Sequence, residues 1–160
     1  MHAISQGRTA ATGERAIRAV HYFFDAYRRH DVEAMVDVCA ENANFRYVPA
    51  EVMRKQQVVR GDGKVRGVGK TWWSSLIDAF PNLTNAVNWI GNDEEGNVAA
   101  EVMISGTQAK AFGTIANSGK HYDLVHLFLF HVNREGLIDD IVAYWDTADW
   151  YRQLGRLECD

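Results

Sequence analysis

The sequence has little cysteine, little proline and no long hydrophobic run. Its 160 residues include two cysteines and two prolines. Cys39 and Cys159 lie far apart, which excludes a disulfide-based scaffold and favours a reducing, cytoplasmic setting. No window reaches the length of a membrane-spanning helix, and residues 1–15 lack the apolar core of a signal peptide. We therefore expect no association with a membrane.

The sequence also lacks an excess of basic charge. Its formal net charge is −4 and it contains no long basic run, which argues against nucleic acid as a partner. The hydrophobic fraction, in contrast, is 47%, enough for one core. Because there is no internal repeat or linker, we expect a single domain over residues 14–160. Residues 1–13 would form a flexible lead-in.

Three stretches with helical periodicity lie in the first half of the chain. Residues 14–30 are predicted to form the first helix, with Thr12 as its N-cap. Its apolar residues recur at three- and four-residue spacing and are Ile17, Val20, Phe24 and Tyr27. A second helix follows with Asp31 as its N-cap. A third is predicted over residues 70–80 and ends at Pro81.

The second half of the chain is dominated by strand-forming residues. Strands are predicted at residues 44–48, 83–90, 98–108, 109–116, 122–132 and 137–145. The last two would be joined by a hairpin turn at residues 133–136. This order predicts an α+β fold in which three N-terminal helices cover one face of a curved, mixed but mostly antiparallel sheet. Such a cone is open at one end, where an apolar pocket with a few polar groups would lie.

Residues 51–68 are basic and rich in glycine, and they carry no clear periodicity. They could form a loop over the pocket or a solvated loop with local charge. The segment is not a phosphate-binding loop, because its lysine spacing differs and no Ser or Thr follows Lys64.

Asp146 lies at the junction between the last strand and a short final helix. A carboxylate at this position can accept hydrogen bonds from the first amides of the helix. It can instead point into a cavity and act as an acid or base. Much of the functional question depends on which of these roles it has.

Four features of the chain together resemble a known family. They are His30-Asp31 between the first two helices, the run 79–83 (Ala-Phe-Pro-Asn-Leu), Ser105-Gly106-Thr107, and Tyr144-Trp145-Asp146 followed by Gln153-Leu154-Gly155. The chain resembles the SnoaL-like polyketide cyclases, in the superfamily of nuclear transport factor 2 and ketosteroid isomerase. The resemblance covers residues 14–155 and implies a cone-shaped α+β domain. It implies no single reaction, because this fold hosts isomerases, cyclases, dehydratases, epoxide hydrolases and non-catalytic binders.

The resemblance implies two candidate catalytic residues. Asp146 would be the acid/base of an aldol closure, in an apolar pocket that raises its pKa. His126 would contact the carbonyl or enolate oxygen; alternatively it is a hydrogen-bonded core histidine. The segment around Tyr47 has no acid, which argues against ketosteroid isomerisation. Residues 122–132 contain no arginine, which weakens the Asp-Arg-Asp relay of the epoxide hydrolases.

Aromatic residues would form the wall of the pocket and stack on an aromatic substrate. The predicted substrate-binding residues are Tyr47, Trp72, Phe128, Phe130 and Trp145. The alternative for each of them is ordinary core packing.

A possible metal motif, H-x-D-x-x-H, is formed by His121, Asp123 and His126. On a strand the first two residues share a face and the third takes the other, so they would not converge on one ion. We predict no metal and no cofactor. Asp139 and Asp140 also face opposite ways and are expected to be solvated.

The sequence therefore predicts a cofactor-free enzyme that performs acid/base chemistry next to a carbonyl, as in aldol cyclisation or isomerisation. The expected partners are a small hydrophobic or aromatic ligand and a second copy of the chain, forming a homodimer through the outer sheet face. The alternatives are a non-catalytic ligand-binding protein on the same fold and a dehydratase or epoxide hydrolase-like enzyme.

Overall fold

The structure is a computed structural model that describes residues 12–52 and 60–156. The predicted lead-in therefore lies outside the described residues, apart from Thr12 and Gly13, and so does Cys159. Helices and strands follow in the order α1 (Gly13–Arg28), α2 (Val32–Asp37), β1 (Cys39–Tyr47), α3 (Val48–Val52), β2 (Asp62–Lys64), a π-helical turn η1 (Val65–Gly69), α4 (Lys70–Ala79), β3 (Thr84–Asn92), β4 (Asn97–Thr107), β5 (His121–Val132), β6 (Ile138–Trp145) and α5 (Thr147–Gln153).

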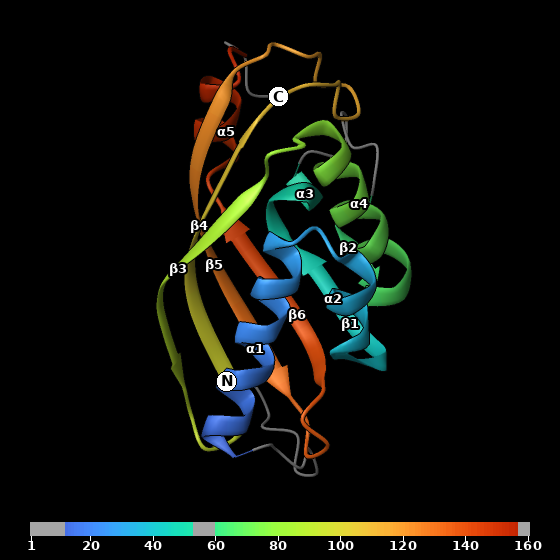
Figure 1. Cartoon of the computed structure of the whole chain (residues 1–160), viewed down its shortest axis with the longest axis vertical. Helices are drawn as coiled ribbons and strands as arrows, with labels where there is room; N and C mark the ends of the chain where they lie inside the picture. Colours follow the sequence, from blue (N-terminus) through green and yellow to red (C-terminus); the bar gives the residue numbers. More distant parts are fainter. Residues whose placement is uncertain (1–11, 53–59, 157–160) are drawn as a thin grey trace.

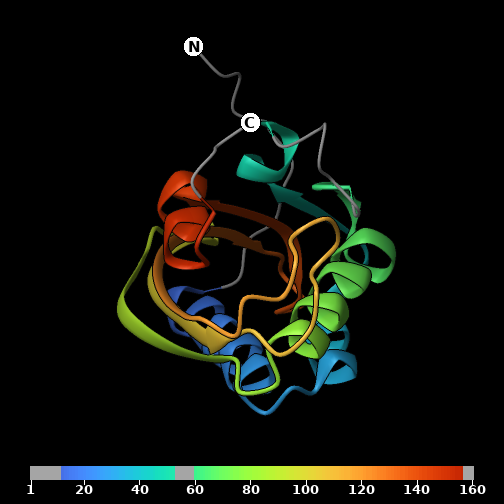
Figure 2. The ribbon, with the colours of Figure 1, turned by 90° about the horizontal axis from the view of Figure 1, so that it is seen from above.

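Within the described residues the strands form one six-stranded sheet in the order β2-β1-β6-β5-β4-β3. Only β1 and β6 are parallel; the other neighbours are antiparallel. The sheet curves around α1, α2 and α4, which cover its inner face (Figure 1). Figure 2 shows the same arrangement from above, with the sheet left open rather than closed into a barrel. The predicted α+β cone is confirmed.

The predicted helices are found within two residues of their expected bounds. In α1, Val20, Phe24 and Tyr27 are buried as predicted, and Phe23 is buried between them. The Asp31 side chain caps α2 by accepting the backbone N–H of Ala34 at 3.0 Å.

The sheet's inner face is made by alternate residues of each strand. On β5 the buried positions include Tyr122, Leu124, His126, Phe128 and Phe130. The register places Val102, His126 and Trp145 side by side on β4, β5 and β6. Tyr47, at the end of β1, approaches Trp145 with ring centroids 5.2 Å apart. The aromatic side chains of three strands therefore meet at one end of the cone.

Two of the resemblance motifs pack against each other. Gly106 lies on the inner face of β4, beneath the corner that follows α4. A Cβ at Gly106 would lie 3.1 Å from Phe80 Cβ and 3.1 Å from Leu83 Cδ1. The close packing of the corner on the sheet therefore explains the glycine between Ser105 and Thr107.

Three sequence predictions need correction. The strand predicted at residues 44–48 begins at Cys39, because Asn44 and the residues before it continue along β6 through a register shift. Residues 109–116 form no strand and contain only an isolated bridge between Phe112 and Ile115. The described part of the segment 51–68 is more ordered than predicted, since it contains β2 and most of η1.

Among the described residues, no helix is long and apolar enough to cross a membrane. Cys39 is buried, and its thiol lies 3.3 Å from the carbonyl oxygen of Met35. Burial raises the pKa of the Cys39 thiol to about 12, so this cysteine is not a reactive thiolate near neutral pH.

Candidate functional site

A small cavity lies at the end of the cone where α4, α5 and the inner face of the sheet meet. Its volume is about 20 Å³, which is room for about one water molecule. Ten of the described residues line it: Tyr27, Tyr47, Trp72, Leu76, Ile104, Tyr122, Leu124, His126, Trp145 and Trp150. None of these ten residues carries a formal charge near neutral pH, so the described wall is apolar with a few polar groups.

The structure brings together four of the seven residues predicted for the site. Tyr47, Trp72, His126 and Trp145 line the cavity. Phe128 and Phe130 do not line it, because their rings pack deeper in the core. Phe128 lies 5.1 Å from the ring of Phe24, and Phe130 lies 5.5 Å from the ring of Phe23.

Asp146 is the seventh predicted residue, and it is exposed. Its carboxylate accepts the backbone N–H of Asp149 at 3.1 Å and so caps α5. It does not line the cavity. Of the two roles considered for this carboxylate, the structure shows the capping role.

His126 is buried, with 8% of its surface exposed. Its Nδ1 lies 2.9 Å from the carbonyl oxygen of Leu124. A carbonyl oxygen only accepts hydrogen bonds, so Nδ1 carries a proton and donates it. In the neutral ring, Nε2 is then unprotonated and has a lone pair.

Burial lowers the pKa of His126 to about 4, and this effect outweighs the hydrogen bond to Leu124, which acts in the opposite direction. The imidazole is therefore neutral near pH 7. It packs against the indole of Trp145, with ring centroids 5.3 Å apart. The cavity thus contains a neutral imidazole that accepts at Nε2 and cannot donate there.

The tyrosines of the site are neutral as well. Burial raises the pKa of the hydroxyls of Tyr27, Tyr47 and Tyr122 well above the ordinary tyrosine value. The Tyr47 hydroxyl accepts the indole N–H of Trp73 at 2.8 Å. Tyr47 is thereby fixed in orientation, and its own hydroxyl proton stays available for donation.

Two tryptophans of the cavity have buried indole nitrogens with no hydrogen-bond acceptor among the described residues. They are Trp145 on β6 and Trp150 on α5. Trp145 was among the residues predicted from the sequence, whereas Trp150 was not. A signal was present: Trp150 lies four residues after the Asp146 cap, which places it one turn into the helix.

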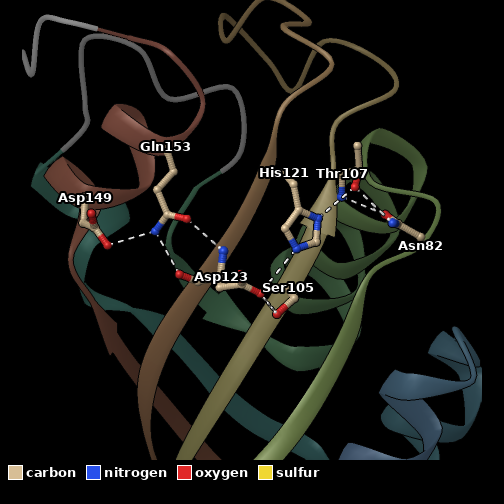
Figure 3. Close-up of polar contacts among 7 residues, drawn as sticks. All are labelled: Asn82, Ser105, Thr107, His121, Asp123, Asp149 and Gln153. Atoms are coloured by element: carbon tan, nitrogen blue, oxygen red, sulfur yellow. Dashed lines mark hydrogen bonds and ion pairs between the residues drawn. The ribbon is translucent and has the colours of Figure 1, made fainter.

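The side chain of Gln153 holds α5, and therefore Trp150, against the sheet (Figure 3). The backbone N–H of Asp123 donates to Gln153 Oε1 at 2.9 Å, and Gln153 Nε2 donates to the carbonyl oxygen of Asp123 at 2.8 Å. Strand β6 pairs with β5 only from His126 onward. The Gln153 amide therefore takes the place of the missing strand beside Asp123, which gives the Gln-Leu-Gly motif a structural role.

Figure 3 also shows that His121 and Asp123 belong to a polar cluster, and neither residue lines the cavity. His121 Nδ1 lies 2.8 Å from Thr107 Oγ1, and its Nε2 lies 3.3 Å from Asp123 Oδ1. Ser105 Oγ donates to the same carboxylate at 2.5 Å. Both residues are exposed whereas His126 is buried on the inner face. As predicted, the three residues of H-x-D-x-x-H do not converge.

Asp139 differs from the sequence prediction. It was expected to be solvated, but it is half-buried and lies 2.5 Å from His131 Nδ1. His131 Nε2 in turn lies 3.2 Å from the carbonyl oxygen of Glu95. This pair ties the β5–β6 hairpin to the β3–β4 turn. It lies at the opposite end of β5 from Tyr122 and is not part of the cavity.

Comparison with protein families identifies the chain. The profile described as a SnoaL-like domain matches residues 20–141. The chain belongs to the SnoaL-like family. No curated protein sequence matches it significantly.

Solved structures extend the comparison of this SnoaL-like chain. AclR, a candidate hydroxylase from Streptomyces galilaeus, aligns with a TM-score of 0.75 and 13% identity, over 92% of this chain and 100% of that one. A candidate polyketide cyclase from Xanthomonas campestris pv. campestris gives a TM-score of 0.68 and 24% identity, over 89% and 98% of the two chains. An LEH-like epoxide hydrolase from M. tuberculosis gives a TM-score of 0.66 and 16% identity, over 89% of this chain and 90% of that one. These similarities establish a shared fold, and the named activities differ among them.

Proposed function

We propose that this SnoaL-like protein is a cofactor-free enzyme that abstracts a proton next to a carbonyl group of a small hydrophobic or aromatic molecule. The observation that carries the proposal is the hydrogen bond between His126 Nδ1 and the carbonyl oxygen of Leu124. It leaves the lone pair of Nε2 as a proton acceptor on a cavity-lining side chain. His126 is the general base in this proposal. Aldol cyclisation and isomerisation both begin with such a step.

This assignment differs from the sequence-based hypothesis in its choice of base. Asp146 was expected to be the acid/base and His126 the partner of the carbonyl oxygen. The Asp146 carboxylate is exposed and occupied by capping, whereas His126 lines the cavity. The neutral His126 ring also has no proton at Nε2 to donate to a carbonyl oxygen.

The walls of the cavity support an aromatic or otherwise flat substrate. Tyr47, Trp72 and Trp145 pack with ring centroids 5.2 to 6.1 Å apart around the cavity. A volume of about 20 Å³ does not hold such a molecule. Binding therefore requires some of these rings to move apart.

The low pKa of His126 restricts the chemistry further. A weak base removes a proton at a useful rate only when the substrate C–H is itself acidic. A methylene next to a carbonyl and also conjugated with an aromatic ring or a second carbonyl meets this condition. We therefore choose 2-tetralone, an uncharged aromatic ketone with such a methylene at C1, as the first test compound.

The experiment follows exchange of the C1 protons of 2-tetralone in D₂O by NMR. We expect the protein to accelerate exchange, and the variant His126→Asn to lower that acceleration roughly 10²- to 10⁴-fold. Asparagine at this position retains an N–H for the carbonyl oxygen of Leu124 but has no basic nitrogen. Asp146→Asn is the matched control and should retain activity, because asparagine also caps helices. Wild-type rates in the His126→Asn variant would rule out His126 as the base.

A second candidate function is a non-catalytic ligand-binding protein on the same fold. The small cavity and the capping role of Asp146 favour it. Binding of 2-tetralone without accelerated exchange would support this function over the enzyme. The epoxide hydrolase alternative has less support, because the ten lining residues include neither an aspartate nor an arginine for a relay around water.

We also propose that two copies of the chain associate through the outer face of the sheet. Val125, Leu127 and Leu129 of β5 point outward and are 39% to 45% exposed. Tyr144 of β6 and Trp89 of β3 extend the same face, at 41% and 57% exposed. Neighbouring apolar side chains on an exposed sheet are typical of a protein interface. A second copy would cover this face symmetrically.

A further inference from the structure

We infer that the indole N–H groups of Trp145 and Trp150 together bind one carbonyl oxygen of the ligand, and that the site selects uncharged carbonyl compounds over carboxylates and hydrocarbons. The inference rests on the ligand-binding part of the proposed function. It does not require His126 to act as a base.

The two indole N–H groups are hydrogen-bond donors without an acceptor among the described residues. Both nitrogens are buried, and neither has a hydrogen-bond partner among the described residues. Buried donors are almost always paired in native proteins, since desolvating one without a partner is costly. Trp73 shows the usual outcome in the same core, because its indole nitrogen donates to the Tyr47 hydroxyl at 2.8 Å.

Both unpaired indoles belong to residues that line the same cavity. The strand β6 carries one and the helix α5 carries the other, so they approach the cavity from two separate elements. Their rings are held by neighbours. Trp145 contacts His126 at 5.3 Å, and Trp150 contacts Tyr122 and Phe112, both at 5.9 Å between centroids. The donors are therefore part of a packed wall rather than free surface groups.

The charge of the cavity sets the class of ligand. No lysine or arginine is among the ten described residues that line it, and His126 is neutral near pH 7. A carboxylate would be desolvated there without a cation to compensate for it. A hydrocarbon would leave both indole donors unpaired. An uncharged molecule with a carbonyl oxygen can accept hydrogen bonds from both donors without burying a charge.

The two donors also suit the proposed reaction. Removal of a proton next to the carbonyl moves negative charge onto its oxygen. Fixed donors aimed at that oxygen stabilise the enolate more than the ketone. Trp145 and Trp150 would then hold the oxygen while Nε2 of His126 takes the proton.

The test is a titration of the ¹⁵N-labelled full chain, followed through its indole N–H signals. The sequence has five tryptophans, so the spectrum contains internal controls. Trp73 is already paired, and Trp89 is 57% exposed on the outer face. The probes are 2-tetralone, tetralin as the hydrocarbon without the oxygen, and tetralin-2-carboxylate as the anion. Loss of one signal in Trp145→Phe and in Trp150→Phe assigns the two signals. If either variant fails to fold, triple-resonance spectra of the unaltered protein assign them instead.

We expect 2-tetralone to move the Trp145 and Trp150 signals downfield together while the Trp73 and Trp89 signals stay in place. Tetralin and the carboxylate should bind at least tenfold more weakly, and each Trp→Phe variant should bind the ketone roughly tenfold more weakly. The inference is overturned if the Trp145 signal or the Trp150 signal stays in place at a saturating ketone concentration, or at 5 mM ketone if saturation is not reached. Equal binding of tetralin or of the carboxylate would also overturn it.

The two proposals can fail separately. Movement of both indole signals with no accelerated C1 exchange would refute the enzyme and leave the carbonyl site standing. Accelerated exchange with an unchanged KM in both Trp→Phe variants would refute the carbonyl site and leave the enzyme standing.

Discussion

The imidazole of His126 and the indole of Trp145 are cross-strand neighbours on β5 and β6, with ring centroids 5.3 Å apart and planes inclined by 37°. One ring accepts at Nε2, and the other has a buried N–H donor with no acceptor among the residues that the structure describes. An acceptor and a donor thus stand side by side at the end of an aromatic core. A ligand with a carbonyl and an adjacent acidic C–H can engage both.

The pH dependence of activity follows from the tautomer and the burial of His126. In the proposed mechanism the active form is the neutral imidazole, and burial lowers the pKa of His126 to about 4. We expect kcat/KM for C1 exchange, corrected for the buffer reaction, to be constant from pH 8 to about pH 5 and to fall as pH decreases toward 4. A fall centred near pH 6.5 would indicate a solvent-exposed histidine as the base and would contradict this assignment.

The same group makes stability depend on pH. The folded-state pKa of His126, about 4, lies below the ordinary histidine value of 6.5, so the unfolded chain binds more protons between these values. Stability is therefore lost as pH falls from about 6.5 to about 4, by about 3 kcal/mol in total.

Urea unfolding at a series of pH values measures this loss. In the variant His126→Asn, the loss of unfolding free energy between about pH 6.5 and about pH 4 should be smaller by about 3 kcal/mol. If the free energy of unfolding depends on pH equally in the two proteins, His126 does not contribute to the pH dependence of stability. A comparison at pH 8 separates this effect from any general cost of the substitution.

Replacing the cap of α5 should reduce stability without removing the active groups. Asp146→Ala leaves the backbone N–H of Asp149 without its partner and is expected to cost about 1 kcal/mol in the free energy of unfolding. Asp146→Asn should cost much less, because an asparagine side chain also accepts this hydrogen bond. Chemical denaturation of the three proteins decides the point. A more stable Asp146→Ala variant would imply that the carboxylate is strained for another purpose.

The outer sheet face gives a prediction about assembly. Leu127→Glu places a charge in the middle of the exposed row on β5 and should convert a dimer to a monomer. Tyr22→Glu is the matched control, because Tyr22 is 50% exposed but lies on α1. Size-exclusion chromatography with light scattering measures both. A monomeric unaltered protein at high concentration would refute the proposed dimer.

Periodicity predicted the long elements well because their burial is one-sided. The alternation on β5 placed His126 on the inner face with Phe128 and Phe130, and the spacing in α1 placed Phe24 and Tyr27 in the core. Local pattern could not show which inward residues border open space. Phe128 and His126 share one face, yet only His126 lines the cavity, because Phe24 fills the space beside Phe128.

Asp146 and Trp150 illustrate the other limit of sequence reasoning. The position of Asp146 at a strand–helix junction is compatible with two roles, and only the direction of the side chain separates them. Trp150 was missed because its approach to the cavity depends on how α5 is held by Gln153, a contact with a residue 30 positions away. The tautomer of His126 is set by the backbone carbonyl of Leu124 and cannot be predicted from the sequence pattern.

The parallel pairing of β1 with β6 joins one of the first elements of the chain to one of the last. Strand β1 and its neighbour β2 cannot be added to the sheet until β6 has been made. During synthesis, the apolar side chains of β1, among them Phe45 and Tyr47, therefore cannot be fully buried until the β5–β6 hairpin has formed. Such distant pairings slow folding and leave apolar surface open to aggregation in the meantime. A chain that stops before β6 should accumulate as a collapsed, chaperone-dependent species rather than as a smaller folded domain.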